Sequence, residues 1–174
     1  MSLDKSTVSA LCAFPEQLEK LFSAVPEGYI DWTPASWEGI PSESFSPVGQ
    51  LCHIRDIEID GYHVRLRRLL EEANPTLASL DSYVLAEERR YSDARPGEIL
   101  ATFRKARGET VATVQRLNDN QLRREGFFEG YGSVTVKSVI HFLCSHDQQH
   151  LAGMYWLLGK IESERALGRS SGGI

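Results

Sequence analysis

The sequence predicts an all-α protein built as a four-helix bundle. Three observations support this fold class: apolar residues recur mostly at helical spacing, four stretches with that spacing are long, and no set of alternating strands is found. The chain has 174 residues, of which 41% are hydrophobic and 25% charged, as is typical of one globular domain. We expect this domain to span residues 1–167 and a disordered tail to follow over residues 168–174.

The first helix is expected from Asp4 to Ala24, because its apolar residues lie close to one stripe. Pro15 should kink this helix or split it in two, and Pro26 should end it. The long connection that follows, residues 25–46, contains three prolines, two glycines and two tryptophans. Because the tryptophans argue against disorder, we interpret this connection as a loop packed over one end of the helices.

The second helix is expected from Pro47 to Glu72, with Ser46 as its N-cap and proline at its first position. Its apolar residues occupy two sides, so it should be more buried than a helix with one apolar stripe. A short helix is expected around Leu80–Tyr91. The third long helix should run from Pro96 to Leu117, with its apolar residues mostly on one side.

The fourth helix is expected to start near Ser133 or Thr135 and to end around Gly159-Lys160. It follows a turn-like segment, residues 126–132, in which Phe127-Phe128 could form a short extended piece. Three of the five histidines of the chain fall between positions 141 and 150, on this helix. That cluster is the one feature of the composition that indicates chemistry.

His146 and His150 are four residues apart, so they lie one turn apart on the same helical face. Two such imidazoles can chelate a divalent metal at about 2.0–2.1 Å, or they can be two ordinary hydrogen-bonded histidines. His53, early in the second helix, is the best candidate for a third ligand, although periodicity does not show that it meets His146. His141 points about 140° away, and His63 lies about 15 Å along the axis from His53, so neither is expected to bind the metal.

The charge and the cysteines restrict the function classes. A formal net charge of −5 gives no general attraction to phosphate backbones, so we expect no nucleic-acid partner. No apolar run reaches the roughly 20 residues that span a bilayer, and no secretory leader is recognised, so we expect a cytoplasmic protein without a membrane partner. Cys12, Cys52 and Cys144 form no CxxC pair and are expected to be reduced thiols that bind no metal.

The run His146-Asp-Gln-Gln-His150 is also similar to the metalloprotease motif HExxH, with aspartate in place of glutamate. Asp147 is one methylene shorter than the glutamate that acts as general base in that motif. The extended motif would place its third ligand at Trp156. The metalloprotease interpretation therefore receives little support.

Two segments together resemble the DinB-like (DinB/YfiT) superfamily of metalloenzymes: residues 46–58, with the early-helix histidine, and residues 138–150, with the histidine cluster. The order, the spacing and the preceding tryptophan-containing loop are similar over residues 4–162. The resemblance implies a four-helix bundle in up-down-down-up order, with a metal held near one end. After the last histidine many relatives continue with Arg-Gly-Gln, whereas this chain has Leu-Ala-Gly at 151–153, so no role is carried over to those positions.

Position by position, the resemblance implies that His53, His146 and His150 are the metal ligands. Members of the superfamily with assigned activities are mostly thiol-dependent, such as transferases that use bacillithiol, mycothiol or glutathione, and a maleylpyruvate isomerase. The first functional expectation is therefore an enzyme that uses a divalent metal, zinc or nickel first, to transfer a low-molecular-weight thiol to a small electrophile. Three imidazoles leave such a metal an open position at which a thiol or water would lose its proton.

Two alternatives stay open. The first is a metal-dependent hydrolase in which Asp56, Glu58 or Asp147 serves as the base. The second is a non-catalytic helical module with a structural metal. In each case we expect a homodimer, and for an enzyme a small-molecule substrate, but the sequence identifies no catalytic residue. Candidates for the substrate pocket are three aromatic and two basic side chains: Trp32, Trp37, Tyr155, Arg55 and Arg65.

Overall fold

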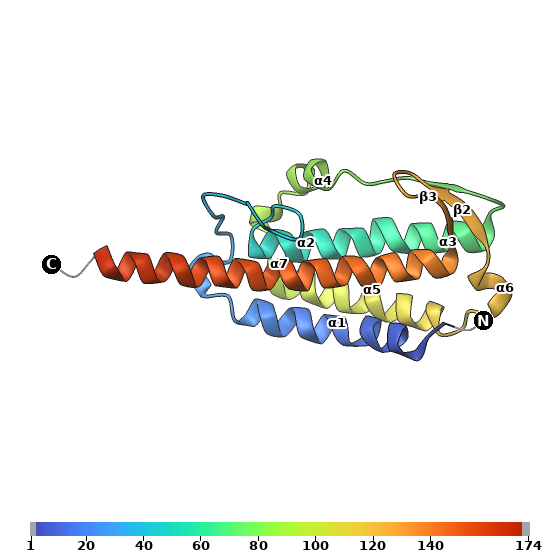
Figure 1. The fold of residues 1–174 in the computed structure, drawn as a ribbon, viewed down its shortest axis with the longest axis horizontal. Helices are drawn as coiled ribbons and strands as arrows, with labels where there is room; N and C mark the ends of the chain where they lie inside the picture. The colour runs from blue at the N-terminus through green and yellow to red at the C-terminus, as the bar shows by residue number, and fades with distance from the viewer. Residues whose placement is uncertain (1–2, 172–174) are drawn as a thin grey trace.

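Four long helical segments lie side by side along the length of the molecule in the computed structural model, which describes residues 3–171 (Figure 1). These segments are α1 (Lys5–Ser23), the second segment from Pro47 to Glu71, α5 (Pro96–Val114) and α7 (Val136–Ser171). The prediction of a mostly helical chain is thereby confirmed. The helix α7 runs past its expected end around Gly159-Lys160 and includes residues 168–171 of the expected disordered tail, whereas residues 172–174 lie outside the described residues.

The second segment is one helix with an irregular middle. It consists of α2 (Pro47–Asp56), a π-helical stretch η2 (Ile57–His63) and α3 (Val64–Glu71). It begins as the sequence predicts, because Pro47 occupies the first turn and the Ser46 hydroxyl accepts a hydrogen bond from the Gly49 amide at 3.3 Å. Short π-helical stretches occur frequently at functional sites, and this one starts four residues after His53.

The helix α1 is continuous across Pro15, so of the two expected effects, a kink or a split, the split does not occur. A proline inside a helix leaves the carbonyl four residues earlier without its usual amide donor, and here that carbonyl belongs to Leu11. The Leu11 oxygen instead accepts a hydrogen bond from Nη1 of Arg107 on α5, at 3.4 Å. A side chain from a neighbouring helix thus provides the missing donor, which makes proline tolerable at this position.

A small sheet corrects the expectation of a purely helical fold. It consists of three strands in the order β1 (Thr76–Leu77), β2 (Glu125–Phe128) and β3 (Gly132–Thr135). The strand β2 is parallel to β1 and antiparallel to β3. Strands of two to four residues are too short to give a period-2 pattern, which is why the sequence indicated only an extended piece. Gly126 lets β2 approach the preceding chain, since a Cβ there would lie 2.8 Å from the Pro75 carbonyl oxygen.

The remaining elements are short. They are the 3-10 turns η1 (Glu27–Tyr29) and η3 (Tyr91–Asp93) and the helices α4 (Ser82–Glu88) and α6 (Asp119–Leu122). The helix α4 lies within the range in which a short helix was expected, and η1 lies in the connection between α1 and α2. None of the helices described is both long and apolar enough to cross a membrane.

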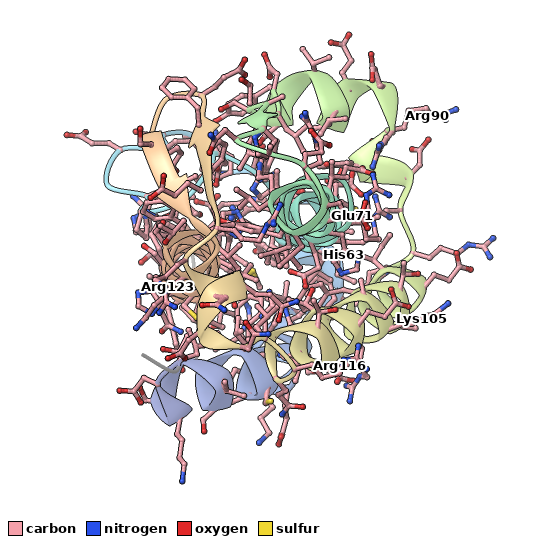
Figure 2. All side chains as sticks on the ribbon, turned by 90° about the vertical axis from the view of Figure 1, so that its right-hand side faces the viewer. His63, Glu71, Arg90, Lys105, Arg116 and Arg123 are labelled. Carbon is pink, nitrogen blue, oxygen red and sulfur yellow. The ribbon has the colours of Figure 1, made fainter. Side chains whose placement is uncertain are left out.

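A layer of buried polar residues divides the core of the bundle. The buried apolar residues form two clusters. One cluster contains Ile54 on the second segment and Met154 on α7, and the other contains Ile57 and Leu143 on the same two helices. Buried polar and charged side chains accompany this change from one cluster to the other. Cationic side chains such as Lys105 extend outside the bundle (Figure 2). Members of the layer are Gln50, His53, Asp56, Glu58, Arg107, Thr110, Asp147 and His150. Because buried polar groups cost stability unless they are paired, this layer is where a functional site is expected.

Candidate metal centre

Three of the five histidines converge in this polar layer. Nε2 of His146 lies 3.2 Å from Nε2 of His53 and 3.1 Å from Nε2 of His150. His53 comes from α2, and the other two come from successive turns of α7, which packs against α2. The packing of two helices therefore brings His53 together with two candidate ligands that follow it by more than ninety residues in the sequence.

The separations among the three nitrogens suit a shared metal. Ligand nitrogens at about 2.0–2.1 Å from a tetrahedral zinc would be separated by roughly 3.3–3.4 Å, close to the distances here. Imidazoles in direct contact offer each other a hydrogen bond only where one nitrogen carries a proton and the other does not. Three ring nitrogens aimed at one point cannot all be satisfied in this way, whereas one cation would satisfy all three.

Gln50 fixes the tautomer of a neutral His150. Its Nε2 donates to the main-chain oxygens of Glu43, at 2.7 Å, and Phe45, at 3.4 Å, which leaves its Oε1 as an acceptor. Nδ1 of His150 lies 2.6 Å from that Oε1 and must be the donor. In a neutral His150 the lone pair is therefore on Nε2, the atom that faces the other two histidines.

Burial also favours neutral imidazoles in the cluster. It lowers the pKa of His53 to about 4, helped by the neighbouring His150. Burial, with His150 and His53 nearby, lowers the pKa of His146 well below its usual range. Both rings are therefore neutral at neutral pH, and each keeps one nitrogen without a proton, as a metal ligand must.

A fourth donor, Glu43, joins the cluster from the connection between α1 and α2. Its Oε2 lies 3.3 Å from Nε2 of His150 and 3.6 Å from Nε2 of His53, and one donor atom from each of the four residues lies within 4.8 Å of the others. Burial opposes the charge of Glu43, but the proximity of His150 and His53 outweighs it and lowers the pKa of Glu43 to about 2. The sequence did not reveal this residue, because an irregular segment has no periodicity that assigns its side chains to a face.

Close packing holds Glu43 in place. The neighbouring Ser42 lies against α7 at Gly153, where a Cβ would lie 2.1 Å from the Ser42 Oγ and 3.0 Å from its Cβ. Glycine is therefore required for this approach, although its position in the sequence suggested no role. The main chain at Glu43 is held further by the hydrogen bond from the Gln50 amide.

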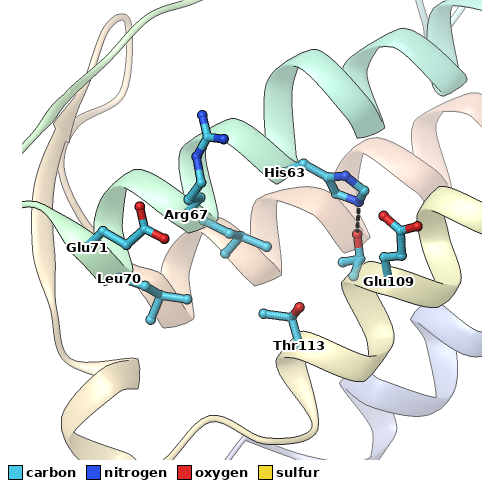
Figure 3. Close-up of a pocket in the computed structure, with 8 residues that line it drawn as sticks. His63, Arg67, Leu70, Glu71, Glu109 and Thr113 are labelled. Carbon is cyan, nitrogen blue, oxygen red and sulfur yellow. Dashed lines mark hydrogen bonds between the residues drawn. The ribbon is translucent and has the colours of Figure 1, made fainter.

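The other two histidines lie outside the cluster. His141 is exposed on α7. Nε2 of His63 lies 2.9 Å from the Thr110 hydroxyl oxygen and 3.0 Å from the Ala106 carbonyl oxygen. His63 borders a separate cavity of about 290 Å³ between α3 and α5 (Figure 3). The other residues around this cavity are Leu66, Arg67, Leu70, Glu71, Glu109, Thr110 and Thr113.

The three carboxylates considered as bases are engaged in other contacts. Glu58 and Asp147 both bind the buried guanidinium of Arg107, with N···O distances of 2.6–3.0 Å. Asp56 accepts hydrogen bonds from Arg55, at 2.6 Å, and from the Tyr91 hydroxyl, at 2.7 Å. These partners make all three carboxylates structural groups, and Glu43 is the carboxylate that faces the histidine cluster.

A pocket of about 130 Å³ borders the cluster. The aromatic candidates Trp32, Trp37 and Tyr155 do not line it: Trp37 stacks on Trp156 with ring centroids 6.0 Å apart, and Tyr155 is exposed. The residues that line the pocket are Glu43, His53, Ile57, Tyr62, Arg65, Ser79, Leu80, Ser82, Phe128, Tyr131 and His146. The walls therefore come from the polar layer, the segment before α4 and the β2–β3 hairpin, whose short strands the sequence did not predict.

Comparison with known proteins gives one family and one fold. A family model described as the DinB superfamily matches residues 10–154. Among solved structures, one similar chain is YfiT from Bacillus subtilis, described as a probable metal-dependent hydrolase with an unusual four-helix bundle topology. The likeness has a TM-score of 0.80 at 20% sequence identity and covers 93% of this chain and 91% of that one. Among curated proteins none gives a significant match.

Proposed function

Because the chain belongs to the DinB superfamily, we propose that it is a divalent-metal-dependent enzyme that hydrolyses a small molecule. The observation that carries the proposal is the convergence of three imidazole Nε2 atoms and one carboxylate beside a pocket. The description of YfiT as a probable metal-dependent hydrolase supports the same reaction class.

In this proposal His53, His146 and His150 hold the metal, with zinc or nickel as the first candidates. The metal would supply Lewis-acid polarisation of a substrate oxygen and acidify a water or thiol. Gln50 keeps the His150 ring in the tautomer that binds, through its hydrogen bond to Nδ1.

Glu43 acts as the base. Its Oε2 would take a proton from the attacking water as the new carbon–oxygen bond forms, and would return that proton to the leaving group as the scissile bond breaks. One feature supports this role: Oε2 lies 3.3 Å from a proposed ligand nitrogen. Glu43 also lines the pocket, so a substrate bound there can reach its carboxylate.

Thiol transfer is the second candidate. The same carboxylate could take the proton of a low-molecular-weight thiol while its sulfur bonds to an electrophilic carbon and the leaving group departs. One observation favours it: Arg65, a basic candidate for the substrate pocket that could bind a carboxylate of a thiol, lines the pocket, whereas Arg55 pairs with Asp56. We also propose a small-molecule substrate, a homodimer and a cytoplasmic location.

For the topology we propose the up-down-down-up order of the four long helices, with a long loop between α1 and α2. The course of the coloured chain in Figure 1 supports this proposal. The position of Glu43 in that connection gives the loop a function, since it contributes a donor to the cluster.

The first experiment measures metal content. Protein purified without added metal should contain about one equivalent of a divalent metal by elemental analysis, and His150→Ala should lose it. His141→Ala is the matched control, because His141 lies exposed on the same helix, and it should retain the metal. Equal metal content in wild type and folded His150→Ala would contradict the proposed ligands.

The second experiment measures the reaction. A panel of small esters and amides, assayed without thiol, should be hydrolysed, and Glu43→Gln should lower the rate by about 10²–10⁴-fold while retaining the metal. Glu38→Gln, in the same connection but exposed, should change nothing. Activity that appears only with an added thiol and an electrophile would replace hydrolysis by thiol transfer. Loss of the metal in Glu43→Gln, with no activity in either assay, would favour a structural metal and overturn the enzyme proposal.

A further inference from the structure

Arg65 is a buried cation that borders the proposed reaction pocket. Only 6% of its surface is exposed, and it lines the pocket together with His53, His146 and Glu43. Burying a guanidinium is costly unless an anion or several acceptors compensate it. The partners of Arg65 therefore indicate whether its charge is already balanced.

The described residues provide no carboxylate for Arg65. Its Nε and Nη2 both donate to a single acceptor, the Ala78 carbonyl oxygen, at 3.3 Å and 3.0 Å, and no ion pair with Arg65 is found among residues 3–167. Arg107, which is also buried, contacts two carboxylates through four hydrogen bonds. A guanidinium has five N–H donors, so Arg65 keeps donors and a full charge for another partner.

The position of Arg65 is well defined. Its Cζ lies 4.5 Å from the centroid of the Phe128 ring and 5.5 Å from that of Tyr62. Its Nη1 lies over Gly61, where a Cβ would approach it to 2.6 Å. The ring of Tyr62 also contacts His146, with ring centroids 6.1 Å apart. Arg65 and the histidine cluster therefore border the same aromatic side chain, and one small molecule in the pocket can reach both.

We propose that Arg65 binds a carboxylate of the substrate, so that the enzyme acts on small monocarboxylate-bearing molecules. This inference rests on the proposed function for the identity of the reacting centre. A planar guanidinium with free donors matches a carboxylate in a bidentate manner. One cation, with the carboxylate of Glu43 at the same pocket, suits a single negative charge better than the double charge of a phosphate monoester. The size of the pocket, about 130 Å³, restricts the bound part to a small group.

The test compares an acid with its neutral amide. Calorimetric titration of the metal-free protein with benzoate and with benzamide measures recognition by Arg65 without any contribution from a metal. We expect benzoate to bind at least tenfold more tightly than benzamide, and Arg65→Met to abolish that preference. Arg65→Lys, which keeps the charge but loses the fork, should keep part of it. Arg67→Met, an exposed arginine of the same helix, should bind both as the wild type does.

The outcomes separate this inference from the proposed function. Equal affinities of the wild type for benzoate and benzamide would overturn the carboxylate subsite. An equal loss of the preference for benzoate in Arg65→Met and Arg67→Met would overturn it as well. If Arg65→Met does not fold, Gly61→Ala displaces the guanidinium and should lower the preference for benzoate in its place. A preference for benzoate in a protein that never retains a metal would leave Arg65 as an anion site and refute only the metal-dependent enzyme. A retained metal without that preference would refute only the subsite.

Discussion

Replacing Arg107 by methionine should strongly destabilise the protein. Arg107 is buried and donates four hydrogen bonds of 2.6–3.0 Å to two buried carboxylates, Glu58 on the second segment and Asp147 on α7. Methionine fills a similar space against Phe14 and Phe103, whose ring centroids lie 5.1 Å and 5.2 Å from the guanidinium carbon. The substitution therefore removes mainly the charge and its donors, and it leaves two buried carboxylates uncompensated.

Breaking a buried ion pair by removing one partner typically costs about 3–5 kcal/mol. For a domain of this size each kcal/mol lowers Tm by about 2–4 °C, so Arg107→Met should lower it by about 6–20 °C. The matched control is Arg104→Met on the same helix, because Arg104 pairs with Glu19 at the surface and is 59% exposed. Such a surface pair contributes about 0–1 kcal/mol. Urea denaturation followed by circular dichroism measures the free energy of unfolding of both variants.

The loss of unfolding free energy caused by Arg107→Met should depend on pH. Burial raises the pKa of Asp147 to about 7, although Arg107 acts to lower it, so the folded protein takes up a proton that the unfolded chain binds only near pH 3.8. Without Arg107 that pKa rises further. As the pH falls from 8 to 5, the variant therefore gains more stability than the wild type does. The destabilisation by Arg107→Met should therefore be largest at pH 8 and smallest near pH 5. A cost below about 1 kcal/mol at pH 8, or a deficit that does not change with pH, would refute this reasoning.

Three further predictions concern the cluster and its supports. Gln50→Ala should weaken metal binding about 10–100-fold in a chelator competition assay, because His150 loses the acceptor that orients it; unchanged affinity would contradict this. Gly153→Ala should weaken metal binding to a similar degree without lowering Tm, since the new Cβ displaces Ser42, and Ser42→Gly in the same chain should restore it. The buried thiol of Cys52, whose pKa burial raises to about 11, should resist iodoacetamide at pH 8 in the native protein and react in denaturant, as mass spectrometry can measure.

The sequence predicted those features that repeat along a helix. The apolar periodicity located all four long helical segments, and the i,i+4 spacing of His146 and His150 placed them on one face, where the structure has them. Periodicity carries no information on which helices are neighbours, so the proximity of His53 to His146 came only with the packing of α2 against α7. The helix across Pro15 shows the same limit, because the donor that makes it possible belongs to a distant helix.

Features outside regular helices were not predictable in this way. Glu43 lies in a connection without a period, and its approach to the cluster depends on contacts distant in sequence, such as the one between Ser42 and Gly153. The walls of the pocket depend partly on the β2–β3 hairpin, whose strands of four residues are too short for a pattern. The carboxylates that the sequence offered as bases pair with arginines, and for Glu58 and Asp147 this arginine lies on a different helix.

The position of Glu43 decides how the cluster can work. With three histidines and one carboxylate, the donor set is complete for a tetrahedral metal, which is the composition of a closed structural site. The four donors are not held equally, however. The histidines project from two packed helices, whereas the Glu43 side chain is 34% exposed and is anchored through its main chain, by the hydrogen bond from Gln50 to its carbonyl oxygen. Rotation of this side chain alone can therefore open one position to the pocket without disturbing the other three donors, and this asymmetry is what favours a catalytic over a structural centre.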